Sequence, residues 1–183
     1  DVNNDGIPDF GVGAPGFGPA FTGVESVTIY SGNTGEELFT LLGSEADESF
    51  GTSISSAGDV NGDGFDDMIV GAPGGDSGTS SAYIFSGATG EQLHRFSGNG
   101  TDSFGISVSG IGDVDGDGYD DVIIGAPEDD TFGTRSGSVS IFSGFDGSLI
   151  TRYFGSSDSL GSSVSDAGDV NGDNKPDFII GAA

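Results

Sequence analysis

Side chains that carry oxygen recur at alternate positions in four short segments, and this spacing is typical of a site for a hard cation. In each segment, positions 1, 3, 5 and 9 hold Asp or Asn, and the backbone carbonyl of position 7 offers one more oxygen. Proteins bind Ca²⁺ with about six to eight such oxygens. Because alternate side chains of a tightly curled loop converge, we predict four calcium sites. Their ligands are Asp1, Asn3, Asp5, Ile7 and Asp9; Asp59, Asn61, Asp63, Phe65 and Asp67; Asp113, Asp115, Asp117, Tyr119 and Asp121; and Asp169, Asn171, Asp173, Lys175 and Asp177.

Position 6 is expected to make the sharp turn of each loop. It is glycine in the first three loops (Gly6, Gly64 and Gly118), and glycine reaches left-handed backbone conformations without strain. The fourth loop has Asn174 instead, and Asn also tolerates this geometry, so we expect the turn to persist. Lys175 at position 7 is expected to weaken calcium binding in this loop.

The EF-hand is the alternative calcium motif, since its loop begins with the same pattern. It requires Glu at position 12 and a helix on each side. Position 12 here is apolar in all four loops (Val12, Val70, Ile124 and Ile180). The sequence therefore excludes an EF-hand and makes the position-9 carboxylate the closing ligand. Asp-Gly segments also form simple turns, but four loops in phase favour metal sites.

The remaining acids and the type of ligand atom restrict further which residues and which metals we expect in these sites. Asp66 and Asp120 at position 8 are expected to be solvated rather than ligating. A ligand set made only of oxygen disfavours zinc and copper. The ligand positions hold 13 carboxylates, so four Ca²⁺ ions would change the formal net charge from −26 to −18.

The loops also mark an internal repeat that predicts the fold. They start at residues 1, 59, 113 and 169, so successive starts differ by 58, 54 and 56 residues. A period of about 56 residues suits a four-stranded antiparallel sheet, and 36 glycines with short apolar runs favour strands and turns over helices. In one repeat, strands are predicted at 106–111, 119–125, 138–143 and 149–154, and turns close the last hairpins at 32–35, 87–90 and 145–147.

We therefore predict an all-β fold of β-propeller blades, as a fragment or an open array. The chain is predicted to be one repeat region over residues 1–183. It contains a partial blade over 1–48, complete blades over about 49–102 and 103–158, and a partial blade over 159–183.

Composition excludes several classes of partner. Thirty acids against four bases repel nucleic acids and anionic membranes. The chain has no cysteine for disulfides or thiolate metal sites, and no apolar run approaches the roughly 18 residues of a membrane span. No signal peptide precedes Asp1, so the chain is expected to be a mature product or a piece of a longer protein.

Two further motifs accompany the loops. Phe-Gly precedes two of them (Phe50-Gly51 and Phe104-Gly105), and Gly-Ala-Pro follows three (Gly13-Ala14-Pro15, Gly71-Ala72-Pro73 and Gly125-Ala126-Pro127). From the residues alone, we expect the aromatic ring to pack between blades and Gly-Ala-Pro to end a strand.

Together with the loops, these motifs resemble the FG-GAP repeats of integrin α-chain β-propellers. The resemblance covers essentially the whole chain and departs from the pattern at Leu160-Gly161 and at Gly181-Ala182-Ala183. It implies calcium on one face, and ligand binding or subunit pairing on the opposite face and rim. It also implies an extracellular or cell-surface location.

The sequence favours a non-catalytic role. The one histidine, His94, is expected to face outward in a strand, and no nucleophile motif accompanies it. The predicted function is adhesion, protein interaction or structural assembly, with a protein ligand, a glycan or further copies of the chain as partner. Two alternatives remain open: a self-assembling extracellular fibre or surface-layer subunit, and an accessory propeller of a larger secreted hydrolase. Asn99-Gly100-Thr101 is a glycosylation sequon and predicts a glycoprotein.

Overall fold

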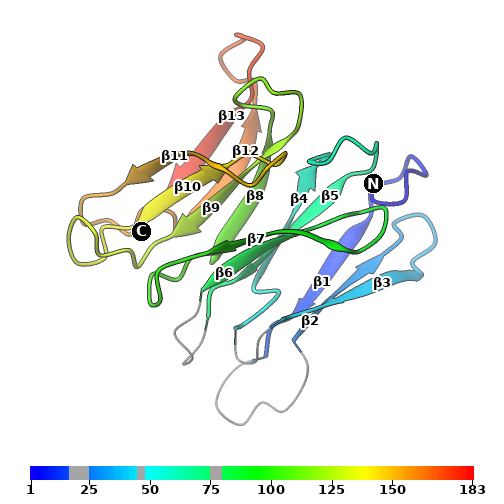
Figure 1. The fold of residues 1–183 in the computed structure, drawn as a ribbon, viewed down its shortest axis with the longest axis horizontal. Coiled ribbons are helices and arrows are strands. Elements are labelled where there is room, and N and C mark those ends of the chain that lie inside the picture. The colour runs from blue at the N-terminus through cyan, green and yellow to red at the C-terminus, as the bar shows by residue number, and fades with distance from the viewer. Residues whose placement is uncertain (17–24, 45–47, 75–79) are drawn as a thin grey trace.

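The computed structural model describes residues 1–16, 25–44, 48–74 and 80–183. These residues form thirteen β-strands (Figure 1). Among the described residues, no helix is long and apolar enough to cross a membrane. The strands are β1 (Phe10–Ala14), β2 (Ser26–Tyr30), β3 (Glu37–Leu42), β4 (Ser53–Gly58), β5 (Asp67–Ala72), β6 (Ser81–Phe85), β7 (Gln92–Ser97), β8 (Ser107–Gly112), β9 (Asp121–Ala126), β10 (Ser138–Phe142), β11 (Leu149–Phe154), β12 (Ser163–Gly168) and β13 (Asp177–Gly181).

The strands form four separate antiparallel sheets, each built from consecutive strands. Their orders are β1-β2-β3, β4-β5-β6-β7, β8-β9-β10-β11 and β12-β13, and we call them blades 1 to 4. The predicted all-β fold of integrin-like propeller blades is confirmed. Strands β4, β8 and β12, the first of their sheets, lie beside one another, so the blades stand side by side.

The predicted strands of blade 3 are all present, and their limits agree with the structure to within one or two residues: β8 lies one residue later than predicted and β10 ends one residue earlier. Strand β11 covers Leu149–Phe154 as predicted, whereas β9 begins at Asp121 rather than at residue 119. Residues 119 and 120 still belong to the Asp-rich loop. The hydrophobic pattern could not reveal where β9 begins, because the aromatic Tyr119 resembles the first residue of a strand.

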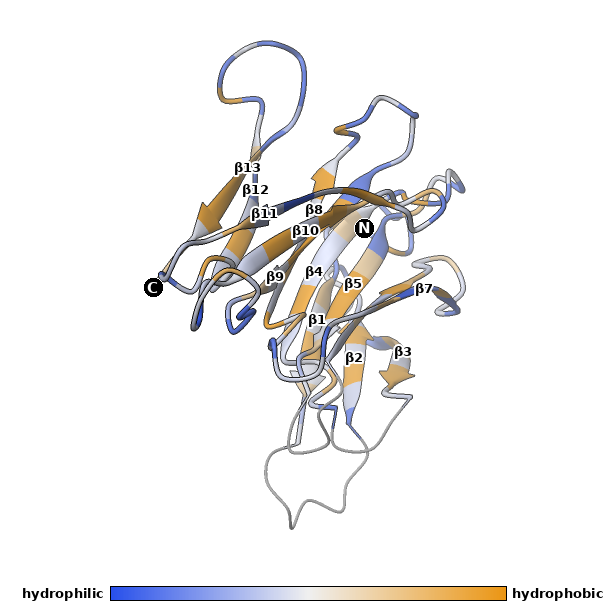
Figure 2. Cartoon of the chain, turned by 60° about the vertical axis from the view of Figure 1, so that its left-hand side comes forward, coloured by the Kyte–Doolittle hydropathy of each residue, from blue (hydrophilic) through white to orange (hydrophobic). Residues whose placement is uncertain are grey.

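Hydrophobic residues are concentrated in the strands (Figure 2), and their buried side chains form clusters that join neighbouring blades. Val27 and Ile29 of blade 1 lie in one cluster with Val70 of blade 2. The next cluster joins Ile69 of blade 2 to Ile124 of blade 3. Successive residues of a strand point to opposite faces, which explains why Ile69 and Val70 serve different clusters. Strands β5 and β9 are buried along their whole length.

The Phe-Gly aromatic rings lie in these inter-blade clusters. Phe50 and Phe104 are 0% and 1% exposed. Phe50 contacts Tyr83 and Phe85 edge-on, with ring centroids 5.6 and 5.8 Å apart. Leu160 occupies the equivalent position between blades 3 and 4 but is only partly buried. The predicted packing role is therefore confirmed.

Glycine is required where Phe-Gly and Gly-Ala-Pro of adjacent blades meet. Gly105 has φ +89°, and its N–H donates to the carbonyl of Gly125 at 2.9 Å. Its own carbonyl lies against Gly71 of the preceding blade, where an added Cβ would come within 1.9 Å of that oxygen. Gly125 contacts the carbonyl of Gly161 in the same way. The paired glycines thus set the close spacing of the blades.

Candidate metal centre

The four Asp-rich loops lie at one end of the array in Figure 1, at the start of β1 and between the first two strands of the other three sheets. Loop 1 (1–9) leads into β1, loop 2 (59–67) joins β4 to β5, loop 3 (113–121) joins β8 to β9, and loop 4 (169–177) joins β12 to β13. Because the sheets share one strand order, the loops occupy equivalent places in successive blades.

The carboxylate at position 1 organises each loop. In loop 3, Oδ1 of Asp113 accepts hydrogen bonds from the N–H groups of Gly116 and Asp117 at 2.6 and 3.1 Å, and Oδ2 accepts from Gly118 at 2.9 Å. The equivalent carboxylates of the other loops accept the N–H groups of positions 5 and 6 in the same way. The loop is thereby curled around its first side chain.

Positions 3 and 5 point back into the same curl. Asp115 accepts the N–H of Asp117 at 3.0 Å, and Asp117 accepts the N–H of Tyr119 at 2.9 Å. Asp113, Asp115 and Asp117 each bring one carboxylate oxygen within 4.8 Å of the others. Three like charges held this close repel one another unless a cation lies between them. The donor set and its convergence fit a hard divalent metal.

In loops 2 and 3, the position-9 carboxylate lies deeper than the other predicted ligands. Asp67 and Asp121 are 0% exposed. Each accepts two backbone N–H groups, and for Asp67 these come from Val60 at 3.1 Å and Gly87 at 2.9 Å. Burial raises the pKa of both carboxyl groups to about 6. Asp121 is not one of the three carboxylates that converge in loop 3. It instead accepts the N–H groups of Val114 and Gly144, and so joins the loop to the turn between the last two strands of the blade.

Sequence reasoning missed the partner of position 9. Gly87 and Gly144 belong to the turn between the last two strands of each blade, which we call the outer turn (32–35, 87–90 and 144–147). An added Cβ at Gly144 would come within 1.9 Å of the Asp120 carbonyl. The available signal was the Ser-Gly pair that recurs at residues 31–32, 86–87 and 143–144.

Position 6 has the backbone geometry that the sequence predicts. Gly6, Gly64 and Gly118 have φ of +86°, +87° and +95°, and Asn174 has φ +64°. The N–H of Asn174 donates to Asp169 at 2.8 Å, as the glycines do to their position-1 carboxylates. The prediction that Asn preserves the turn is confirmed.

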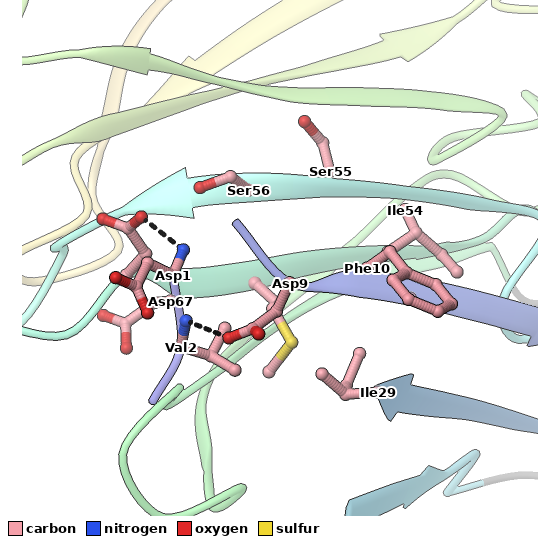
Figure 3. Close-up of a pocket in the computed structure, with 12 residues that line it drawn as sticks. Asp1, Val2, Asp9, Phe10, Ile29, Ile54, Ser55, Ser56 and Asp67 are labelled. Carbon is pink, nitrogen blue, oxygen red and sulfur yellow. Dashed lines mark hydrogen bonds and ion pairs between the residues drawn. The ribbon is translucent and has the colours of Figure 1, made fainter. Parts of the chain in front are cut away.

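The prediction that the position-8 acids are solvated is wrong for Asp120. Its Oδ2 accepts the N–H of Asp59 in the preceding loop at 2.9 Å, and burial raises the pKa of its carboxyl group. The side chain of Asp66 remains about half exposed, yet its Oδ2 accepts from the N-terminal nitrogen of Asp1 at 2.9 Å. Figure 3 marks this contact with a dashed line at Asp1. Inter-blade contacts of this kind have no local sequence signal.

The prediction that His94 faces outward is also wrong. The side chain is partly buried, and its Nε2 lies 2.9 Å from the carbonyl oxygen of Gly144 in the next blade. Strand β7 is the last of its sheet, and its neighbour is the outer turn of blade 3. His94 thus contributes to the contact between blades.

Comparisons with known proteins agree with this architecture. The FG-GAP repeat family model matches residues 50–85 and 104–142. The chain is 38% identical over 140 residues to integrin alpha-4 of Xenopus laevis, an alignment that covers 69% of the chain and 13% of that protein. It is 34% identical over 208 residues to integrin alpha-V of Gallus gallus, covering 100% of the chain and 19% of that protein.

The chain therefore spans less than a fifth of the length of these integrin relatives. Within that span, the two family matches begin at Phe50 and Phe104, the aromatic residues that lie between blades. Each match continues through an Asp-rich loop and the next two strands. The chain is an FG-GAP repeat protein with integrin alpha-chain-like β-propeller blades.

Proposed function

We propose that this chain is a non-catalytic calcium-binding module that works outside the cell in adhesion, protein interaction or structural assembly. The observation that carries the proposal is the shared hydrogen-bond pattern of the four loops. Each gathers oxygen side chains at positions 1, 3 and 5 around one curl, and one of them brings three carboxylates within 4.8 Å. Such a cluster stores repulsion that a divalent cation relieves.

Each loop would hold one Ca²⁺ ion with the side chains of positions 1, 3, 5 and 9 and the carbonyl of position 7. Bound calcium supplies a charged cross-link within the loop. The residues of this chain supply the rest: position 1 curls the backbone, and position 9 joins the loop to the outer turn through Gly87 or Gly144. A filled loop would therefore fix the end of each blade.

The proposed extracellular location follows from calcium supply and from charge. Millimolar calcium outside cells fills sites that would stay empty at resting cytosolic levels. The formal net charge of −26 disfavours nucleic acids and anionic lipids as partners. We infer a protein or glycan ligand, as the relationship to integrin alpha chains suggests. Asn99 of the sequon is exposed and accessible for glycosylation.

The test is a calcium titration monitored by calorimetry, together with thermal melts in excess Ca²⁺ and in EDTA. Four bound ions per chain are expected. A single site occupied at 100 times its Kd adds about 2.7 kcal/mol to the unfolding free energy, so the melting temperature should fall in EDTA by about 5–10 °C or more.

Matched variants make the titration specific. Asp63→Ala and Asp117→Ala should each remove about one bound ion, because each deletes a converging carboxylate. Glu91→Ala changes the charge equally at an exposed residue outside the loops and should leave four ions bound. Loss of an ion in the control, or no calcium binding in the parent chain, would refute the proposal.

A further inference from the structure

The loops of adjacent blades touch each other, and position 8 makes the closest polar contact. Oδ2 of Asp120 in loop 3 accepts the N–H of Asp59 in loop 2 at 2.9 Å. Asp59 is the position-1 residue around which loop 2 curls. Residue 120 also directly precedes Asp121, the position-9 carboxylate of loop 3. One side chain therefore joins the organising residue of one loop to the end of the next.

The surroundings of Asp120 are shaped to admit its side chain. An added Cβ at Gly58 would lie 2.0 Å from Asp120 Oδ2, so only glycine leaves room for it. The Tyr119 ring lies over Gly62, where an added Cβ would come within 2.9 Å, and stacks on Phe145 with centroids 4.7 Å apart. Loop 3 thus covers one side of loop 2.

Loops 1 and 2 repeat this contact, whereas loops 3 and 4 do not. Asp66 accepts from the nitrogen of Asp1 at 2.9 Å, and the Asn4 side chain donates to the Gly64 carbonyl at 3.4 Å. In loop 4, position 8 is Pro176, whose ring lies 3.2 Å from the Cβ that Gly112 lacks. Proline carries no acceptor at this place, so the polar link between loops 3 and 4 is missing.

The charges around Asp120 indicate how its contact with Asp59 would change when a cation binds. Asp120 lies close enough to Asp59, Asp66 and Asp113 for their negative charges to oppose its own. Cations in loops 2 and 3 would offset the charges of Asp59 and Asp113. The carboxylate of Asp120 would then hold the Asp59 N–H against less repulsion, and filling either loop would favour the ordered form of the other.

From this geometry we propose that Asp66 and Asp120 are positioning residues that couple cation binding between neighbouring loops, linking loop 1 to loop 2 and loop 2 to loop 3 and leaving loop 4 independent. The inference rests on the proposed calcium function. Coupling between two sites is reciprocal, and typical coupling factors are about 5- to 150-fold. Emptying loop 3 should therefore weaken loop 2 by about fivefold or more.

The experiment needs a signal from one loop at a time. Tyrosine close to Tb³⁺, an oxygen-seeking stand-in for Ca²⁺, sensitises its luminescence, and position 7 of loop 3 is already Tyr119. The double substitution Phe65→Tyr with Tyr119→Phe moves this signal to loop 2. Loop-2 affinity for Tb³⁺ is then measured in this parent, with Asp117→Ala to empty loop 3, with Asp120→Ala, and with both.

With Asp120 present, Asp117→Ala should weaken loop 2 by about fivefold or more; with Asp120→Ala, the further loss should be less than about twofold. A long-range charge effect would persist without Asp120, so equal factors in both backgrounds would overturn the proposal. Asp120→Asn keeps an acceptor oxygen and should retain more coupling than Asp120→Ala. Circular dichroism and melting in excess Ca²⁺ establish that each variant folds.

Loop 4 supplies the matched control and a gain-of-function test. Asp173→Ala empties loop 4 at the same position that Asp117→Ala empties loop 3, and should leave Tb³⁺ binding at loop 3 unchanged. Pro176→Asp should make loop 3 respond to Asp173→Ala. Absence of Tb³⁺ and Ca²⁺ binding at every loop would overturn both proposals, whereas binding without coupling would overturn this one alone.

Discussion

Loop 3 and loop 4 share one ligand pattern but differ in their surroundings. Asp121 at position 9 of loop 3 is fully buried and accepts from the outer-turn residue Gly144, whereas Asp177 is partly exposed and accepts from the Asn171 side chain. Burial raises the pKa of Asp121 to about 6, while the backbone N–H of Asn174 and other hydrogen bonds lower the pKa of exposed Asp169. The hydrogen bonds inside a loop follow from its own residues, and its burial follows from the blades beside it.

The largest difference between blades 3 and 4 is expected at the glycines that face a neighbouring blade. Gly125→Ala would place a Cβ 2.1 Å from the Gly161 carbonyl, a backbone atom that cannot move aside alone, whereas Gly181→Ala meets only the Ser163 hydroxyl at 2.2 Å. We expect Gly125→Ala to lower the free energy of unfolding by more than about 4 kcal/mol and Gly181→Ala by less than about 1 kcal/mol. Urea melts of both variants in calcium measure the difference, and similar losses would contradict it.

The second test compares the side chains that fill equivalent inter-blade spaces. Phe104 is 1% exposed and packs edge-on against Phe142, with centroids 6.2 Å apart, whereas Leu160 is only partly buried. Phe104→Ala should cost about 3–4 kcal/mol of unfolding free energy, as is usual for a buried aromatic ring. Leu160→Ala should cost about half of that. An equal cost in denaturant melts would mean that blade 4 is held as tightly as the others.

The third test concerns position 9 without metal. Asp121→Ala leaves the N–H groups of Val114 and Gly144 without their acceptor, and we expect a loss of about 2 kcal/mol in EDTA because unpaired buried donors are costly. Asp177→Ala should cost less than about 1 kcal/mol, since its surroundings are more exposed. Asp121→Asn keeps one acceptor oxygen and should recover part of the stability. If Asp121→Ala is neutral in EDTA, position 9 acts only through calcium.

The sequence predicted the features that repeat along the chain, including the apolar ring between blades, and missed the polar contacts that join one blade to the next. Strand β11, the turn at Asn174 and the buried ring of Phe104 were all predictable, because periodic hydrophobicity and turn chemistry are local properties. The contacts of Asp120 and His94 were not, since each partner lies about 50 or more residues away in the chain. Ser-Gly at the outer turn could have been linked to the loops by its fixed recurrence.

The smallest expected effect is that of the Lys175 charge on the calcium affinity of loop 4. Lys175 places a cation at position 7, where the other loops have Ile7, Phe65 and Tyr119. Because Lys175 is exposed, water weakens its repulsion of a bound ion. Lys175→Gln should therefore raise the calcium affinity of loop 4 only about two- to threefold in low salt.

Salt decides whether that gain comes from charge. The Debye length falls to about 3 Å at 1 M ionic strength, so the advantage of Lys175→Gln should disappear there. Calcium titrations of a chain with loops 1 to 3 disabled by Asp5→Ala, Asp63→Ala and Asp117→Ala would isolate loop 4 for both measurements. A gain that persists in high salt would point instead to a change in the loop backbone, and would make the side chain at position 7 a determinant of loop shape.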